Sequence, residues 1–79
     1  MRYEVERKGY KMPRDRYTFV VKNRRGVAAA LIEKLKTQFP WMAFSIDKDD
    51  HDGLKLIAHS FDTVVTWSFG VFKTEKEGT

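Results

Sequence analysis

The sequence contains no cysteine. Neither a disulfide nor a thiolate-ligated metal can therefore stabilise the fold, and nothing in the composition favours secretion, so we expect a cytoplasmic protein. A chain of 79 residues forms one domain and buries only about 60 to 65% of the surface of its unfolded state. We therefore expect a thin core, which association with a second copy would help to stabilise.

Long apolar runs are also missing. No stretch approaches the roughly 18 residues of a membrane span, and the first residues lack the apolar region of a signal peptide. We therefore expect no contact with a membrane.

Signatures of catalysis are absent too. His51 and His59 are the only histidines, no catalytic serine motif accompanies them, and the five glycines form no phosphate-binding pattern. The sequence therefore predicts a protein that is not an enzyme and needs no cofactor.

Charge, by contrast, is abundant and unevenly distributed. Residues 1–25 contain nine Lys/Arg and three Asp/Glu, a balance of +6, whereas residues 26–79 contain six and eight, a balance of −2. A concentrated basic segment is typical of a site for a polyanion. The alternative is an ordinary solvated surface, since 33% of all residues are charged.

One segment, residues 24–39 (RRGVAAALIEKLKTQF), has the period of a helix. Val27, Leu31 and Leu35 recur at intervals of four and form an apolar stripe, and the proline that follows ends the helix. Asn23 is the predicted N-cap, because its side-chain oxygen can accept an unpaired amide of the first turn.

The remaining segments alternate as strands do. In the last of them Val65, Trp67 and Phe69 share one face, although Ser60 could instead cap a second helix there. The predicted class is α+β, a single helix packed on an antiparallel sheet in the order ββαβββ, followed by a frayed tail at 74–79. The expected strands are 1–8, 16–22, 41–46, 54–59 and 64–73.

One helix cannot cover such a sheet. Five strands span about 20 to 24 Å, whereas a helix covers only about 10 to 12 Å. We therefore expect a homodimer, or a partner protein, to cover an aromatic interface formed by Trp41, Trp67 and Phe69. Base stacking on Trp41, Trp67 and Tyr3 is the less favoured interpretation of these rings.

The strongest functional signal is a set of cations interleaved with tyrosines around a predicted hairpin loop at 9–15. Cations bind phosphates and aromatic rings stack on unpaired bases, so the combination favours single-stranded or irregular nucleic acid, RNA more than DNA. The alternative is that these cations only protect an edge strand from aggregation. The set is Arg7, Lys8, Tyr10, Lys11, Arg14, Arg16 and Tyr17.

Arg24 and Arg25 extend this predicted nucleic-acid site. They lie at the expected start of the helix, where the dipole disfavours cations, so an anion is expected to sit beside them.

Residues 47–53 (DKDDHDG) are predicted to form an acidic hairpin turn. As a calcium loop the segment fails, because Lys48 stands where the first carboxylate belongs and His59 where the closing glutamate belongs. A looser divalent site at 49–52 is less favoured than a polar turn, so no metal is predicted.

These features predict a small basic nucleic-acid-binding protein, RNA favoured, with a regulatory or accessory role. Its size, charge and lack of cysteine are compatible with a bacteriophage accessory protein. The alternative is a small inhibitor or antitoxin-like protein that docks on a protein target through exposed aromatic residues. Salt separates the two, because only binding to phosphates weakens steeply as salt rises.

Overall fold

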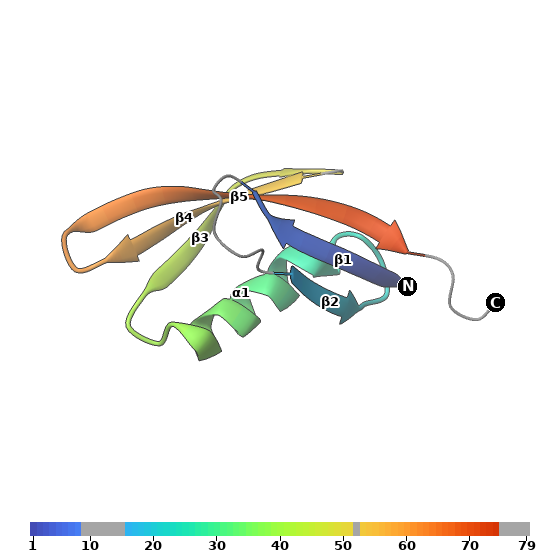
Figure 1. The fold of residues 1–79 in the computed structure, drawn as a ribbon, viewed down its shortest axis with the longest axis horizontal. Helices are drawn as coiled ribbons and strands as arrows, with labels where there is room; N and C mark the ends of the chain where they lie inside the picture. Colours follow the sequence, from blue (N-terminus) through green and yellow to red (C-terminus); the bar gives the residue numbers. More distant parts are fainter. Residues whose placement is uncertain (9–15, 52, 75–79) are drawn as a thin grey trace.

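The computed structural model describes residues 1–8, 16–51 and 53–74. Within these ranges the chain forms five strands around one helix, which confirms the predicted α+β class and the order ββαβββ (Figure 1). The elements are β1 (Arg2–Arg7), β2 (Arg16–Val20), α1 (Gly26–Gln38), β3 (Ala43–Asp50), β4 (Gly53–Ser60) and β5 (Thr63–Thr74).

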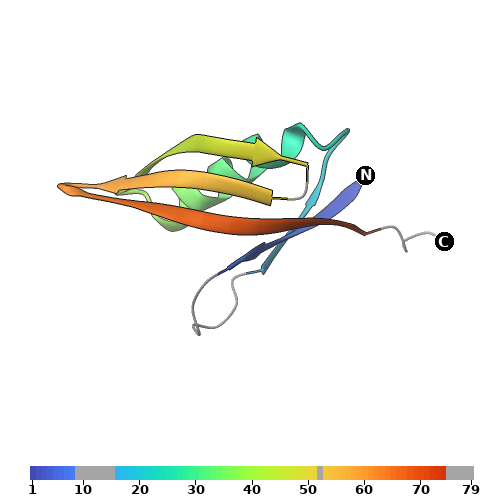
Figure 2. The same ribbon diagram turned by 90° about the horizontal axis from the view of Figure 1, so that it is seen from above.

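The strands form one sheet in the order β2-β1-β5-β4-β3, and all neighbours are antiparallel. α1 connects the two edge strands, β2 and β3, and lies against one face of the sheet (Figure 1). No helix or strand of the described residues covers the other face, which Figure 2 shows from above with α1 behind the sheet. We call this surface the helix-free face.

β5 is the central strand, and its 12 residues make it the longest. The alternative of a second helix at this position is therefore wrong. β5 is rich in β-branched and aromatic residues, which suit a pleated sheet. Its backbone pairs with β1 on one side and β4 on the other, so both edges of the strand have hydrogen-bond partners.

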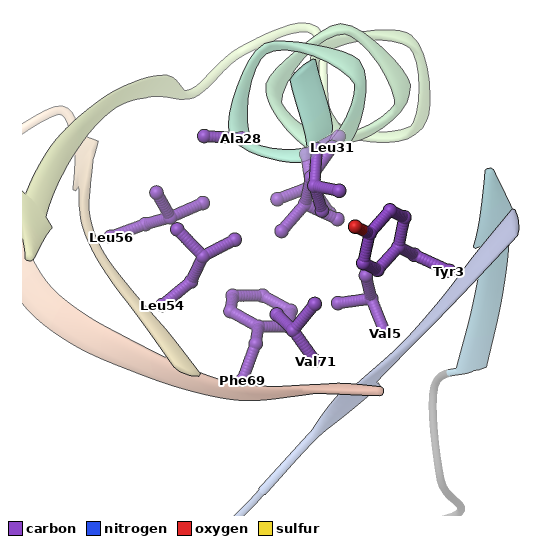
Figure 3. Packing of buried hydrophobic residues seen from close by; sticks show 10 residues of the cluster. Tyr3, Val5, Ala28, Leu31, Leu54, Leu56, Phe69 and Val71 are labelled. Carbon is purple, nitrogen blue, oxygen red and sulfur yellow. The ribbon is translucent and has the colours of Figure 1, made fainter. Parts of the chain in front are cut away.

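The core lies between α1 and the sheet. Val27, Leu31 and Leu35 are 0%, 0% and 1% exposed, which confirms the apolar stripe predicted for the helix. Figure 3 shows Leu31 of this stripe facing side chains of β1, β4 and β5, and Val27 and Leu35 belong to the same cluster. Burying each such side chain contributes about 1.5 to 3 kcal/mol. The cluster consists of Tyr3, Val5, Val27, Ala28, Leu31, Leu35, Leu54, Leu56, Phe69 and Val71.

The start of the helix differs from the prediction. Arg25, not Asn23, is the cap residue, and no side chain bonds to the amides of the first turn. Instead a tight turn precedes the helix: the amide of Gly26 donates to the carbonyl of Asn23, and that of Val27 to the carbonyl of Arg24, both at 3.1 Å. Backbone carbonyls thus satisfy amides that a side-chain cap would have taken.

The hairpin between β3 and β4 is also tighter than predicted. β3 continues to Asp50 and β4 begins at Gly53, so only positions 51 and 52 remain for the turn. A shift in register between Ile46 and Lys48 accommodates one extra residue, as a β-bulge does. The acidic segment predicted as a loop is therefore mostly strand.

Arg24 ties the start of α1 to the tip of this hairpin. Its Nε atom donates to the carbonyl of His51 at 3.1 Å, and its Nη2 atom donates to the carbonyl of Asp50. Nη2 also lies 3.1 Å from the Oδ1 atom of Asp49. The anion expected beside the helix start is therefore a carboxylate of the protein itself.

We expect Arg24→Ala to lower the free energy of unfolding by about 1 to 2 kcal/mol. Hydrogen bonds to a charged group contribute about 1.5 to 3 kcal/mol, but the Nη1 atom is buried and has no hydrogen-bond partner among the described residues, which offsets part of this. Urea denaturation measures the change. Arg25→Ala, an exposed neighbour, is the control and should stay within about 0.5 kcal/mol of wild type. Equal effects of the two substitutions would show that the contacts of Arg24 with the hairpin do not stabilise the fold.

Candidate functional site

The predicted basic patch does not form one surface, because consecutive residues of a strand point to opposite faces. Arg7 lies on the helix side, where its guanidinium carbon is 4.2 Å from the centre of the Trp67 ring. Tyr17 is also on that side, and its hydroxyl donates to Oε1 of Gln38 in α1 at 3.0 Å. The neighbours Lys8 and Arg16 belong to the helix-free face.

The other members of the predicted patch are dispersed. Arg16 forms an ion pair with Glu6 at 3.6 Å, Arg24 holds the β3–β4 hairpin, and Arg25 is exposed at the start of α1. Tyr10, Lys11 and Arg14 lie outside the described residues. Of the described members, only Lys8 and Arg16 share the helix-free face.

The predicted aromatic interface is corrected as well. Phe69 is 1% exposed, so it belongs to the core and offers no surface to a partner. Trp67 is half-buried, with its ring centre 5.7 Å from that of Phe39 and 5.5 Å from that of Phe44. Of the three residues predicted for this interface, only Trp41, at 58% exposed, presents a large aromatic surface. Because the helix covers this side of the sheet, the side chains of Trp67 and Phe69 pack inside the protein.

The helix-free face carries a row of three lysines that crosses the sheet. Lys55 of β4 stands opposite Ser68 of β5 on one side and Lys48 of β3 on the other. Lys8 follows β1, and its amide donates to the carbonyl of Ser68 at 2.8 Å. Three strand spacings of about 4.8 Å place all of these residues within about 15 Å. We call Lys8, Lys48 and Lys55 the lysine row.

The lysine row frames a hollow of about 220 Å³. Gly53 and Ser68 also line this hollow, together with Asp50, whose carboxylate is 3.7 Å from Nζ of Lys48. Residues without a large side chain leave space between the lysine stems, so a ligand can approach the backbone of the sheet. With three ammonium groups and one carboxylate, the hollow has a net positive charge.

Lys48 and Lys55 are a like-charge pair. Residues directly opposite in an antiparallel sheet approach closely, and like charges there destabilise the pair. An ammonium group donates hydrogen bonds and accepts none. The arrangement therefore favours an anion that can bridge two or three lysines. The function that these groups can perform is to bind such an anion.

Sequence reasoning missed the pairing of Lys48 with Lys55 because Lys48 was placed in a predicted turn at 47–53, whereas Lys55 was placed in a strand. The Asp-Gly pair that ends this segment would not have given the pairing. As a two-residue loop, positions 52 and 53 pair position 51 with 54, and hence position 48 with 57. In the structure Gly53 instead pairs with Asp50, which sets Lys48 opposite Lys55.

The described acidic residues of the hairpin, which do not include Asp52, turn to different partners. Asp49 bonds to Arg24, whereas Asp50 pairs with Lys48 on the opposite face. Within residues 1–8, 16–51 and 53–74, no three histidine, aspartate or glutamate side chains come together in an arrangement that could hold a metal ion.

Comparisons of the chain with protein-family models, curated proteins and solved structures find no match. In the part of the chain that the structure describes, no helix has the length and apolar character needed to cross a membrane.

We expect Lys55→Gln to raise the free energy of unfolding in chloride by about 0.2 to 1 kcal/mol, because it removes a cross-strand repulsion. The added stability that wild type gains when sulfate replaces chloride at equal ionic strength should shrink in this variant. Thermal and urea unfolding in both salts measure these changes.

Lys34→Gln, on an exposed part of α1, is the matched control. Sulfate stabilises most proteins through exclusion from their surface, so this variant should keep the full gain. If both variants gain equally from sulfate, the lysine row does not bind anions.

Proposed function

We propose that the chain is a small non-enzymatic nucleic-acid-binding protein with a regulatory or accessory role. The helix-free face binds the phosphate backbone, and RNA is preferred to DNA. One observation carries this proposal: Lys8, from the start of the chain, converges on one hollow with Lys48 and Lys55 of the β3–β4 hairpin. Clustered lysines attract phosphate oxygens and release counterions when they bind them.

The surroundings of the hollow suit a flexible strand better than a duplex. The site lies on an open sheet, and the described chain has no projecting helix on that face to enter a groove (Figure 2). Proteins that bind unpaired nucleic acid combine such a positively charged surface with aromatic side chains. The segment 9–15, which follows Lys8 directly, adds Lys11 and Arg14 to the positive charge of the sequence.

The test is a triple substitution of the lysine row, Lys8→Ala with Lys48→Ala and Lys55→Ala. Each phosphate contact on a single strand contributes about 0.7 to the slope of log affinity against log salt. We therefore expect the slope to flatten by about 2, and affinity at low salt to fall about 10- to 100-fold. Fluorescence anisotropy with a single-stranded RNA of about 12 nucleotides, between about 50 and 300 mM salt, measures both.

The control is the triple variant Lys22→Ala, Lys34→Ala and Lys36→Ala, which removes the same charge from exposed positions away from the hollow. This variant should keep a slope near that of wild type. Equal losses in the two triple variants would show that the lysine row is not a site, and failure of wild type to bind RNA or DNA would refute the proposed function.

A second candidate function rests on the opposite end of the sheet, where apolar side chains remain exposed. Trp41 is 58% exposed, Phe61 94%, Val64 60% and Val65 40%. They lie at one end because Ala43 pairs with His59 and the β4–β5 turn follows directly (Figure 1). We call these four residues the apolar end.

Phe61 stands out within the apolar end because its φ is 52°. This left-handed conformation strains a residue that has a side chain, and with 94% exposure the ring contributes little to packing. An aromatic residue at such a position fits a contact with another protein. This supports an inhibitor or antitoxin-like protein that docks on a protein target, or a contact between two copies. The homodimer stays a prediction.

We expect Phe61→Gly to raise the free energy of unfolding by about 0.5 to 1 kcal/mol. Relief of left-handed strain gains about 1 to 2 kcal/mol, and the greater freedom of unfolded glycine offsets about 0.5 to 1 kcal/mol of this. Phe61→Ala keeps the strained Cβ and should stay close to wild type. Urea denaturation of both variants decides the matter: a fall in stability for Phe61→Gly would mean that the ring serves the fold rather than a partner.

A further inference from the structure

We propose that Phe72 is a base-stacking platform beside the lysine row, so that the site selects nucleic acid with unpaired bases. This inference rests on the proposed function and adds the class of ligand: a single strand whose phosphate lies in the hollow while a base lies on the phenyl ring.

Phe72 and the lysine row belong to the same face. Along β5, Ser68, Gly70 and Phe72 are spaced by two, so all three point to the helix-free face. Ser68 lies in the hollow, and Gly70 lies between it and Phe72. Counting only residues on this face, Phe72 is the second after Ser68, which stands beside the lysine row.

The ring leans over Gly70 toward the lysines. A Cβ atom placed on Gly70 would lie 3.1 Å from Cζ and 3.3 Å from Cε2 of Phe72. The same position is 3.4 Å from Cε of Lys8. The end of the phenyl ring and the stem of Lys8 thus both lie over a residue that has no side chain. Because Gly70 leaves this space, the ring can lie down against the sheet and beside a cation.

Half of the surface of this ring remains open. Phe72 is 51% exposed, although a domain of this size has few large apolar side chains to spare for its core. A phenylalanine that packs the end of its ring over a glycine and leaves half of its surface open to solvent can stack on a base. Every base has a π-face, so stacking tolerates any sequence but requires that the base be unpaired.

The decisive variant is Phe72→Leu, which keeps an apolar side chain but removes the ring. Stacking contributes roughly a 5- to 150-fold gain in affinity for each base, so we expect single-stranded RNA to bind at least about fivefold more weakly. Binding of inorganic polyphosphate, which has charge but no bases, should change by less than about twofold. Wild type should prefer the single strand to a duplex of the same sequence, and the variant should lose much of that preference.

The matched control is Phe61→Leu, which alters an exposed phenyl ring at the far end of the sheet. It should leave RNA and polyphosphate binding unchanged. Phe72→Trp, which keeps a stacking ring, should bind RNA at least as tightly as wild type. Circular dichroism of each variant checks the fold before binding is measured by anisotropy and competition.

The outcomes separate this inference from the function on which it rests. If Phe72→Leu leaves RNA binding unchanged, or weakens RNA and polyphosphate equally, Phe72 does not stack, whereas the lysine row can still bind phosphate. If Phe72→Trp loses as much affinity as Phe72→Leu, stacking is likewise refuted. If wild type binds neither single-stranded nucleic acid nor duplex, the proposed function fails and this inference fails with it.

Discussion

The structure depends on one packing interaction, that of a single helix against one face of a five-stranded sheet. Val27, Leu31 and Leu35 reach only that face, so the buried side chains of the strands gather there (Figure 3). The opposite face receives the alternate residue of every strand and has no covering element among the described residues. The physical constraint that builds the core therefore also assigns lysines, small residues and one open phenyl ring to a common surface.

The same alternation explains why a continuous basic segment of sequence does not become a continuous basic surface. Arg7 and Lys8 are adjacent in the chain, yet the first stacks on Trp67 under the sheet and the second contributes to the hollow above it. On the helix side, Arg7 stacks on an aromatic ring and Arg24 donates hydrogen bonds to backbone carbonyls. On the helix-free face the cations are more exposed: Arg16 and Lys48 form ion pairs with exposed or half-exposed carboxylates, and the lysine row surrounds an open hollow in which a phosphate can bind.

The β3–β4 hairpin links the stability of the fold to the geometry of the lysine row. Arg24 holds the tip of the hairpin from the helix side, and the register of its strands sets Lys48 opposite Lys55 on the other face. Nearby, Gly70 lets Phe72 and Lys8 approach each other. The pairing of the strands thus positions the lysine row, the hollow that it surrounds and the ring of Phe72.

Periodicity within the sequence determined the apolar stripe of the helix, the strands, the order of these elements along the chain and the α+β class. A period of 3.6 or 2 is a property of neighbouring residues. The composition, which has no cysteine, also determined that no disulfide stabilises the fold. Only the tertiary structure decided that Lys8, Lys48 and Lys55 meet, that Arg24 serves the hairpin, and that Phe69 is core. These outcomes depend on which strands pair and in what register, and a shift of one residue would move each side chain to the other face.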